Sequence, residues 1–339
     1  MGLACCTQQT RQLPACYVLG GRNTMEVPLK SAELLDIPSN SCWQRMEEMN
    51  EARYGSAAAT LQNYLVVLGG MGSKREPLSS VEMYNPITKE WISSTSMRVG
   101  RYAHAAVAIA ENLYVCGGVI RGKPGEQALI TTNRVERYTS NLDVWEVMPK
   151  MAEARSFAAG AMLSALRLDA AQDKLEAFQT AGGARRARQK EGRPGHVYIC
   201  GGEDGSGNSL ATAERFDIPA EKWSSIASMR LARAGCAAAT AAGALYVMGG
   251  ADHEKTPLES VERFDPAIGA WGLISNMTCS RRNCSAVAAA GVLYVFGGEG
   301  NAGWAGLSTA ERFDPEVGMW EPIRCSMSTV RSGCCSALL

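Results

Sequence analysis

A short run of apolar residues that ends at two adjacent glycines recurs six times along the chain. Tyr64–Leu68, followed by Gly69-Gly70, is one example. The six pairs are Gly20-Gly21, Gly69-Gly70, Gly117-Gly118, Gly201-Gly202, Gly249-Gly250 and Gly297-Gly298. Four of the five intervals between them are 48 or 49 residues, and the remaining interval is 84. A period of this length is typical of a four-stranded propeller blade, so the chain is predicted to be a repeat array.

Residues 53–97 show how one repeat alternates between strand and turn signals. A run of small residues, 55–60, precedes a turn at Gln62-Asn63 and the apolar strand Tyr64–Leu68. After the glycine pair and a polar loop, a third strand ends at Asn85-Pro86, and a fourth contains Trp91. Four short strands separated by turn residues predict an antiparallel blade.

Three further residue types keep their places in every repeat. Tryptophan recurs at Trp43, Trp91, Trp145, Trp223, Trp271 and Trp320, and methionine follows each of them. Four residues beyond each methionine is an arginine: Arg53, Arg101, Arg155, Arg233, Arg281 and Arg331. We call these the repeat tryptophans and the repeat arginines. With the glycine pairs, they fix the boundaries of the six repeats.

The distribution of small and bulky residues and the two chain ends predict a closed ring. Small residues dominate the first strand of each repeat, and a blade narrows toward the ring axis. Residues 13–46 hold three strands but no first strand, whereas residues 331–339 resemble a first strand without partners. Joining them completes a sixth blade and leaves no open edge. The expected organisation is an N-terminal tail over 1–12 and a six-bladed propeller over 13–339.

The long interval indicates an insert of about thirty residues at 164–195, in the hairpin between two strands of one blade. Its first half has a helix-compatible spacing of apolar residues, and residues 185–190 are basic. It is interpreted as an insertion tolerated on a loop, with a docking element, a localisation signal or a gene-model error as alternatives.

Charge and cysteine usage exclude several classes of function. The chain has 34 basic and 34 acidic residues, so no net field favours nucleic acid or an anionic membrane. The 12 cysteines include Cys116 and Cys200, which occupy apolar strand positions and indicate a core role in a reducing cytoplasm or nucleus. No secretory signal is found, and Met1-Gly2 with Cys5-Cys6 is only a weak match to a lipidation motif.

The double glycine, Glu-x-Tyr/Phe and tryptophan resemble the kelch family. The stretch Leu78–Trp91 is especially similar to the C-terminal propellers of kelch-like (BTB-kelch) proteins. The resemblance implies an all-β, six-bladed kelch-type β-propeller with four antiparallel strands per blade and a C-terminal innermost strand that closes the ring. The BTB domain or F-box that recruits a ubiquitin ligase in such proteins is not found, so a ligase role requires another subunit or a longer gene product.

The candidate binding residues lie on the face formed by the repeat arginines and the loops after the glycine pairs. Related propellers grip acidic peptides there, and a guanidinium suits a carboxylate. The six repeat arginines are therefore predicted to face a ligand, the alternative being that they cap loop carbonyls. Loop residues that differ between repeats complete the candidate site: Arg22, Arg75, Arg121, Asp252, His253 and Trp304. The glutamates that occur in every repeat are interpreted as structural: Glu33, Glu82, Glu136, Glu214, Glu262 and Glu311.

The predicted function is a non-enzymatic protein-interaction module that binds a short acidic segment, with substrate reception for a ubiquitin ligase as one form of it. A cytoskeletal or actin scaffold is an alternative. A kelch-type enzyme, such as a sugar epimerase or a metal-dependent lyase, is another, with Glu203, Asp252 and His253 as residues that could converge. No catalytic residue, metal or cofactor is predicted, because three histidines form no evident acid–base set.

Overall fold

The computed structural model describes residues 14–37, 42–122, 128–164, 195–301 and 306–339. Every regular element in these ranges is a β-strand, which confirms the prediction of an all-β chain. Over the same residues there is no helix with the length and apolarity needed to cross a bilayer. The N-terminal tail with its weak lipidation motif, nearly all of the insert and Trp304 lie outside the described residues.

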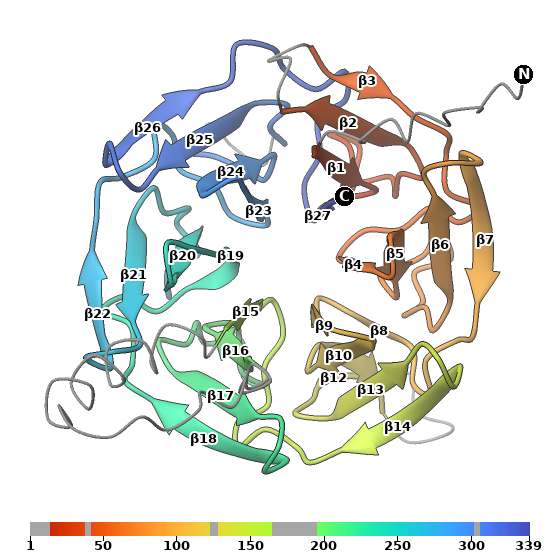
Figure 1. Cartoon of the computed structure of the whole chain (residues 1–339), viewed down its shortest axis with the longest axis horizontal. Coiled ribbons are helices and arrows are strands. Elements are labelled where there is room, and N and C mark those ends of the chain that lie inside the picture. The colour runs from red at the N-terminus through yellow and green to blue at the C-terminus, as the bar shows by residue number, and fades with distance from the viewer. Residues whose placement is uncertain (1–13, 38–41, 123–127, 165–194, 302–305) are drawn as a thin grey trace, which may run out of the picture.

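Six four-stranded antiparallel sheets are arranged around a common centre (Figure 1). Sheet 1 contains β27 (Cys335–Leu338), β1 (Ala15–Leu19), β2 (Ala32–Asp36) and β3 (Gln44–Arg45). Sheet 2 contains β4 (Ala57–Leu61), β5 (Tyr64–Leu68), β6 (Val81–Asn85) and β7 (Glu90–Ser94). Sheet 3 contains β9 (Ala105–Ile109), β10 (Asn112–Cys116), β13 (Val135–Thr139) and β14 (Val144–Met148).

The remaining sheets follow the same order from the centre outward. Sheet 4 contains β15 (Ala159–Leu163), β16 (His196–Cys200), β17 (Ala213–Asp217) and β18 (Lys222–Ile226). Sheet 5 contains β19 (Ala234–Ala241), β20 (Ala244–Ala251), β21 (Val261–Asp265) and β22 (Ala270–Leu273). Sheet 6 contains β23 (Ser285–Ala289), β24 (Val292–Phe296), β25 (Ala310–Asp314) and β26 (Met319–Pro322). A small three-stranded sheet contains β12 (Leu129–Thr131), β11 (Val119–Arg121) and β8 (Arg101–Tyr102).

The two ends of the described chain meet in sheet 1. The C-terminal strand β27 pairs antiparallel with β1, with Cys16 opposite Leu338 and Leu19 opposite Cys335. Sheet 1 therefore combines one strand from the C-terminal end with three strands from the N-terminal end (Figure 1).

Around the centre, six backbone hydrogen bonds form a closed cycle. Each joins the residues that lie two positions after successive repeat arginines. The cycle runs from Gly55 to Gly333, Asn283, Gly235, Phe157, Ala103 and back to Gly55, with N···O distances of 2.7–2.9 Å. All six residues have φ between 53° and 68°, which turns each N–H and C=O toward its neighbours in the cycle. The inner rim of the six sheets is thus one hydrogen-bonded circle.

Glycine pairs are required because the sheets approach each other closely where the second strands end. Gly249 has a φ of 62°, and a Cβ at this position would overlap the carbonyl oxygen of Arg281 in the next repeat. The repeat tryptophans connect neighbouring repeats in the outer part of the sheets. The indole N–H of Trp223, for example, donates to the carbonyl oxygen of Pro149 in the preceding repeat at 2.9 Å.

Candidate functional site

The repeat arginines are buried, so the prediction that they face a ligand is wrong. All six side chains are 0–1% exposed. Arg233 donates to the carbonyl oxygens of Gly249 and Ser260, both at 2.8 Å, and its Nη2 lies 3.1 Å from a carboxylate oxygen of Glu262. The other five, Arg53, Arg101, Arg155, Arg281 and Arg331, donate in the same way to the carbonyl of the first glycine of a pair. They cap loop carbonyls, which was the alternative interpretation.

The repeat glutamates complete these buried contacts, as their structural interpretation anticipated. Glu262 accepts hydrogen bonds from the backbone N–H groups of Arg230, at 2.7 Å, and Leu231, at 3.1 Å. Burial alone would raise the pKa of Glu311, but hydrogen bonds from Thr278 and the nearby Arg281 outweigh it and lower this pKa. The Glu311 carboxylate is therefore stabilised in its charged form, and the repeated glutamate–arginine contacts join successive repeats.

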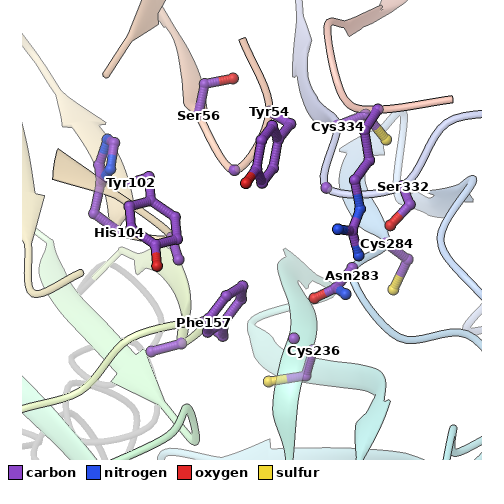
Figure 2. A pocket seen from close by; sticks show the side chains of 16 residues that line it. Tyr54, Ser56, Tyr102, His104, Phe157, Cys236, Asn283, Cys284, Ser332 and Cys334 are labelled. Atoms are coloured by element: carbon purple, nitrogen blue, oxygen red, sulfur yellow. The ribbon is translucent and has the colours of Figure 1, made fainter. Parts of the chain in front are cut away.

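The six residues of the hydrogen-bonded cycle help to line a cavity of about 280 Å³, which we call the mouth cavity (Figure 2). Its lining comes mainly from the residues one to three positions after each repeat arginine. Tyr54, Tyr102 and Phe157 form an aromatic side, and their side chains point toward the middle of the cavity. Asn283 faces them from the opposite side.

The backbone fixes the aromatic side chains in place. Tyr102 lies in β8, where it pairs with Val119 of the loop after the glycine pair, and Tyr54 forms an equivalent bridge with Met71. The rings of Tyr102 and Phe157 meet edge to face, with centroids 6.3 Å apart. Partial burial raises the pKa of Tyr102, with smaller contributions from Tyr54 and Glu203. A neutral aromatic surface with hydroxyl groups therefore faces the opening.

The polar side of the mouth cavity contains one cationic side chain, Arg22. Arg22 lines the cavity, lies 3.0 Å from a carboxylate oxygen of Glu299 and stands 5.6 Å from the ring centroid of Tyr54. Glu299, which is 2% exposed, also binds Arg282 at 2.8 Å and accepts a hydrogen bond from the Ser332 hydroxyl. Burial would raise the pKa of Glu299, but Ser332, Arg22 and Arg282 together lower it. Arg22 also lies 3.5 Å from a carboxylate oxygen of Glu26, so its guanidinium group is shared between two carboxylates beside the cavity.

The floor of the mouth cavity consists of groups that do not serve acid–base chemistry. His104, Cys236, Cys284 and Cys334 are buried, each three positions after a repeat arginine. Burial, helped by Arg101 and Arg53, lowers the pKa of His104 to about 3, so its imidazole is neutral near pH 7. Burial raises the pKa values of the three thiols to about 11 or 12. Within the described ranges, no group of three or more His, Cys, Asp or Glu residues is placed to hold a metal ion.

The predicted loop residues are not gathered into one site. Arg75 and His253 are exposed on their loops, and Arg121 is exposed at the end of β11. Among the predicted loop residues that the structure describes, only Arg22 lines the mouth cavity. Asp252 is partly buried, and its Oδ1 accepts the backbone N–H groups two and four positions later, at 3.0 and 2.9 Å. Asp252 therefore shapes its own loop, a role that a carboxylate in a turn commonly has.

The enzyme alternative rested on Glu203, Asp252 and His253. Glu203 lies 2.8 Å from the ammonium group of Lys255, and Asp252 is used in its turn. In the described structure these side chains do not line the mouth cavity.

Sequence reasoning missed Tyr54, Tyr102, Phe157 and Asn283. The signal was present in the two positions after each repeat arginine, which vary between repeats while the arginine does not. The first of these positions holds Tyr54, Tyr102, Ser156, Ala234, Arg282 and Ser332. The sequence analysis considered only the loops after the glycine pairs, so it identified Arg22 but not the residues on the other side of the cavity.

A repeated four-stranded sheet with buried glutamate–arginine pairs defines a β-sheet repeat protein. Comparison with known families identifies which one. The model described as Kelch motif matches residues 52–98, 100–152, 194–230, 232–278 and 280–327, together more than half of the chain. The chain belongs to the kelch-repeat family.

Individual relatives match parts of the chain. Alpha-scruin of Limulus polyphemus is 28% identical over 38% of this chain and 14% of its own length. Kelch-like protein 25 of Xenopus tropicalis is 25% identical over 63% of this chain and 39% of its own length. An F-box/kelch-repeat protein of Arabidopsis thaliana is 40% identical over 22% of this chain and 20% of its own length. The chain thus spans less than half of the curated relatives it matches.

A solved structure supports the fold. The structure of YjhT superposes with a TM-score of 0.68 at 16% identity, and the match covers 86% of this chain and 91% of that one. At this identity the likeness concerns the fold.

Proposed function

We propose that this chain is a closed six-bladed kelch propeller that acts as a protein-interaction module. The closed cycle of six backbone hydrogen bonds and the pairing of β27 with β1 support the ring. The mouth cavity is the binding site, and its ligand is a short acidic segment of a partner protein. The carrying observation is the combination of three aromatic residues, at positions that vary between repeats, with the cationic Arg22 around one opening.

The chemistry of the two sides specifies what the segment offers. An apolar or aromatic side chain packs against Tyr54, Tyr102 and Phe157, because such rings supply large contact areas at little entropic cost. A carboxylate of the same segment lies toward Arg22 and Asn283, which offer charged and neutral donors.

We further propose a place for the module in the cytoplasm or nucleus, as the recognition part of a larger assembly. The relatives named Kelch-like and F-box/kelch-repeat favour substrate reception for a ubiquitin ligase, with the recruiting domain on another subunit or in a longer product. The likeness to alpha-scruin leaves a scaffold role as the second candidate.

The test is a selection from a displayed library of random peptides, followed by affinity measurements. Selected peptides are expected to contain acidic and aromatic residues, and Tyr102→Ala is expected to lower their affinity about 30-fold, the equivalent of ~2 kcal/mol at a binding hot spot. Arg22→Ala is expected to weaken binding and its salt dependence, whereas Arg75→Ala, at an exposed arginine outside the cavity, serves as the matched control. Equal effects of Arg22→Ala and Arg75→Ala would place the ligand elsewhere.

A further inference from the structure

A contact between neighbouring sheets is repeated six times, and one of the six contains two cysteines. In each contact the indole N–H of a repeat tryptophan donates to a backbone carbonyl of the adjacent repeat, at 2.7–3.0 Å. The indole of Trp43 donates to the carbonyl oxygen of Cys325 at 3.0 Å. Cys42, which directly precedes Trp43, forms a disulfide with Cys325, and their Cα atoms are 5.3 Å apart.

The other five contacts have no cysteine in these two positions. Each contact has one residue directly before the tryptophan and one residue that supplies the carbonyl. In that order the five pairs are Glu90 and Glu47, Val144 and Thr95, Lys222 and Pro149, Ala270 and Ala227, and Met319 and Ser275. The disulfide is therefore no general feature of the repeat.

The location of the cysteine pair gives it a distinct role. The backbone runs from β26 of sheet 6 into β27 of sheet 1, but β1, β2 and β3 enter sheet 1 from the other end of the chain. Strands β1–β3 are thus joined to the C-terminal part by non-covalent contacts. These are the pairing of β1 with β27, the buried ion pair of Arg331 with Glu33 and hydrogen bonds such as that from Trp43 to Cys325. The disulfide spans 283 residues and adds a covalent link at this junction.

We propose that Cys42 and Cys325 form a reversible redox clasp on the ring. Reduction by a small thiol breaks the S–S bond. Two reductant thiols give up two electrons and form their own disulfide, and their protons end on Cys42 and Cys325. Oxidation by a small disulfide reverses each step. The reduced protein keeps its fold, but β1–β3 are then held by non-covalent contacts only.

Accessibility distinguishes this pair from the buried cysteines of the described residues. Cys42 is exposed and Cys325 is partly exposed, so a small thiol can reach them. Cys16, Cys116 and Cys200 are buried in the core, and burial raises the pKa of Cys16 and of Cys116 to about 12. The reactive thiolate is scarce in such surroundings, so these residues do not compete for exchange.

The first experiment is peptide mass analysis of the full chain, without reduction, after equilibration with oxidised and then with reduced glutathione. The expected result is a peptide pair linked through Cys42 and Cys325 in the first condition and its loss in the second. Failure to form this pair in oxidised glutathione would overturn the proposal.

The second experiment measures backbone hydrogen exchange in the same two conditions. Reduction is expected to accelerate exchange in β1 and β2 at least about tenfold and to lower Tm by about 3–6 °C, while β16 and β20 exchange as before. The double variant Cys42→Ser/Cys325→Ser should behave as the reduced protein in both conditions, and Cys279→Ser, at a partly buried free thiol, should retain the wild-type response. Wild-type exchange that is unchanged by reduction would contradict the clasp, whatever the variants do.

Discussion

Replacement of Arg233 by methionine tests whether the repeat arginines hold the ring together or bind a ligand. Arg233 and Glu262 are both 0% exposed, and their side chains approach to 3.1 Å. Methionine fills a similar volume but leaves the carboxylate of Glu262 without its buried counter-charge. The carbonyl oxygens of Gly249 and Ser260 also lose their charged donor.

The expected loss follows from these contacts. Removing one partner of a buried ion pair costs about 3–5 kcal/mol, and each buried acceptor left without a donor costs about 1–3 kcal/mol more. We therefore expect Arg233→Met to lower the free energy of unfolding by at least about 5 kcal/mol. With an unfolding entropy of about 2.1 cal/mol/K per residue, this corresponds to a drop in Tm of about 7 °C.

The assay is denaturant unfolding followed by tryptophan fluorescence, with a second variant as the control. Arg233→Met/Glu262→Gln removes the stranded charge, while the amide oxygen still accepts from one of the two backbone N–H groups. It is expected to recover about 2 kcal/mol of the loss. If Arg233→Met were within about 1 kcal/mol of wild type and instead lost peptide binding, the structural assignment of the repeat arginines would be refuted.

Three other predictions concern positions with a single clear cause. The pKa of His104 is about 3 in the fold against an ordinary 6.5, so the neutral imidazole contributes fully to the free energy of unfolding above pH 6.5. This contribution is lost as the pH falls, by about 2 kcal/mol at pH 5. His104→Ser should remove that part of the pH dependence of unfolding, and an unchanged pH dependence would show that it does not come from His104. Gly249→Ala should lower the free energy of unfolding by more than about 2 kcal/mol, because φ is positive and a Cβ has no space there. Gly272→Ala, where no heavy atom lies within 4 Å of the added Cβ, should be close to neutral. Similar losses in thermal unfolding for the two variants would contradict this explanation of the glycine pairs. Trp223→Phe should cost about 1 kcal/mol by leaving the Pro149 carbonyl without its donor, and an unchanged midpoint of denaturation would show that this hydrogen bond contributes little.

Repetition within the chain was sufficient to predict four strands in each repeat, although it did not predict the small sheet of β8, β11 and β12. The small residues of β4 lie near the centre and Trp91 lies in the outermost strand of sheet 2, as a narrowing blade requires (Figure 1). The orphan strand at 331–339 was also placed correctly, since β27 pairs with β1. These features follow from periodicity, and periodicity is visible in a single sequence.

The roles of the arginines and of the mouth residues were not predictable in the same way. An arginine beside a loop is usually exposed, and only the three-dimensional approach of the glycine-pair carbonyls and Glu262 makes burial of Arg233 favourable. Tyr102 and Asn283 are far apart in sequence and line one cavity only because the six inner strands surround one centre (Figure 2).

The pairing of Cys42 with Cys325 has the same origin. The sequence-based interpretation placed cysteines in the core of a protein in a reducing compartment, and the disulfide differs from that interpretation. The two residues come together only where the first and last repeats meet.

The proposed binding at the mouth cavity is tested most directly by hydrogen exchange of the protein with and without a selected peptide bound. The account predicts protection confined to the residues after the repeat arginines, at 54–56, 102–104, 157–158 and 282–284, together with Arg22. Protection confined to the outermost strands β7, β14, β18, β22 and β26, with no change around the mouth cavity, would contradict it.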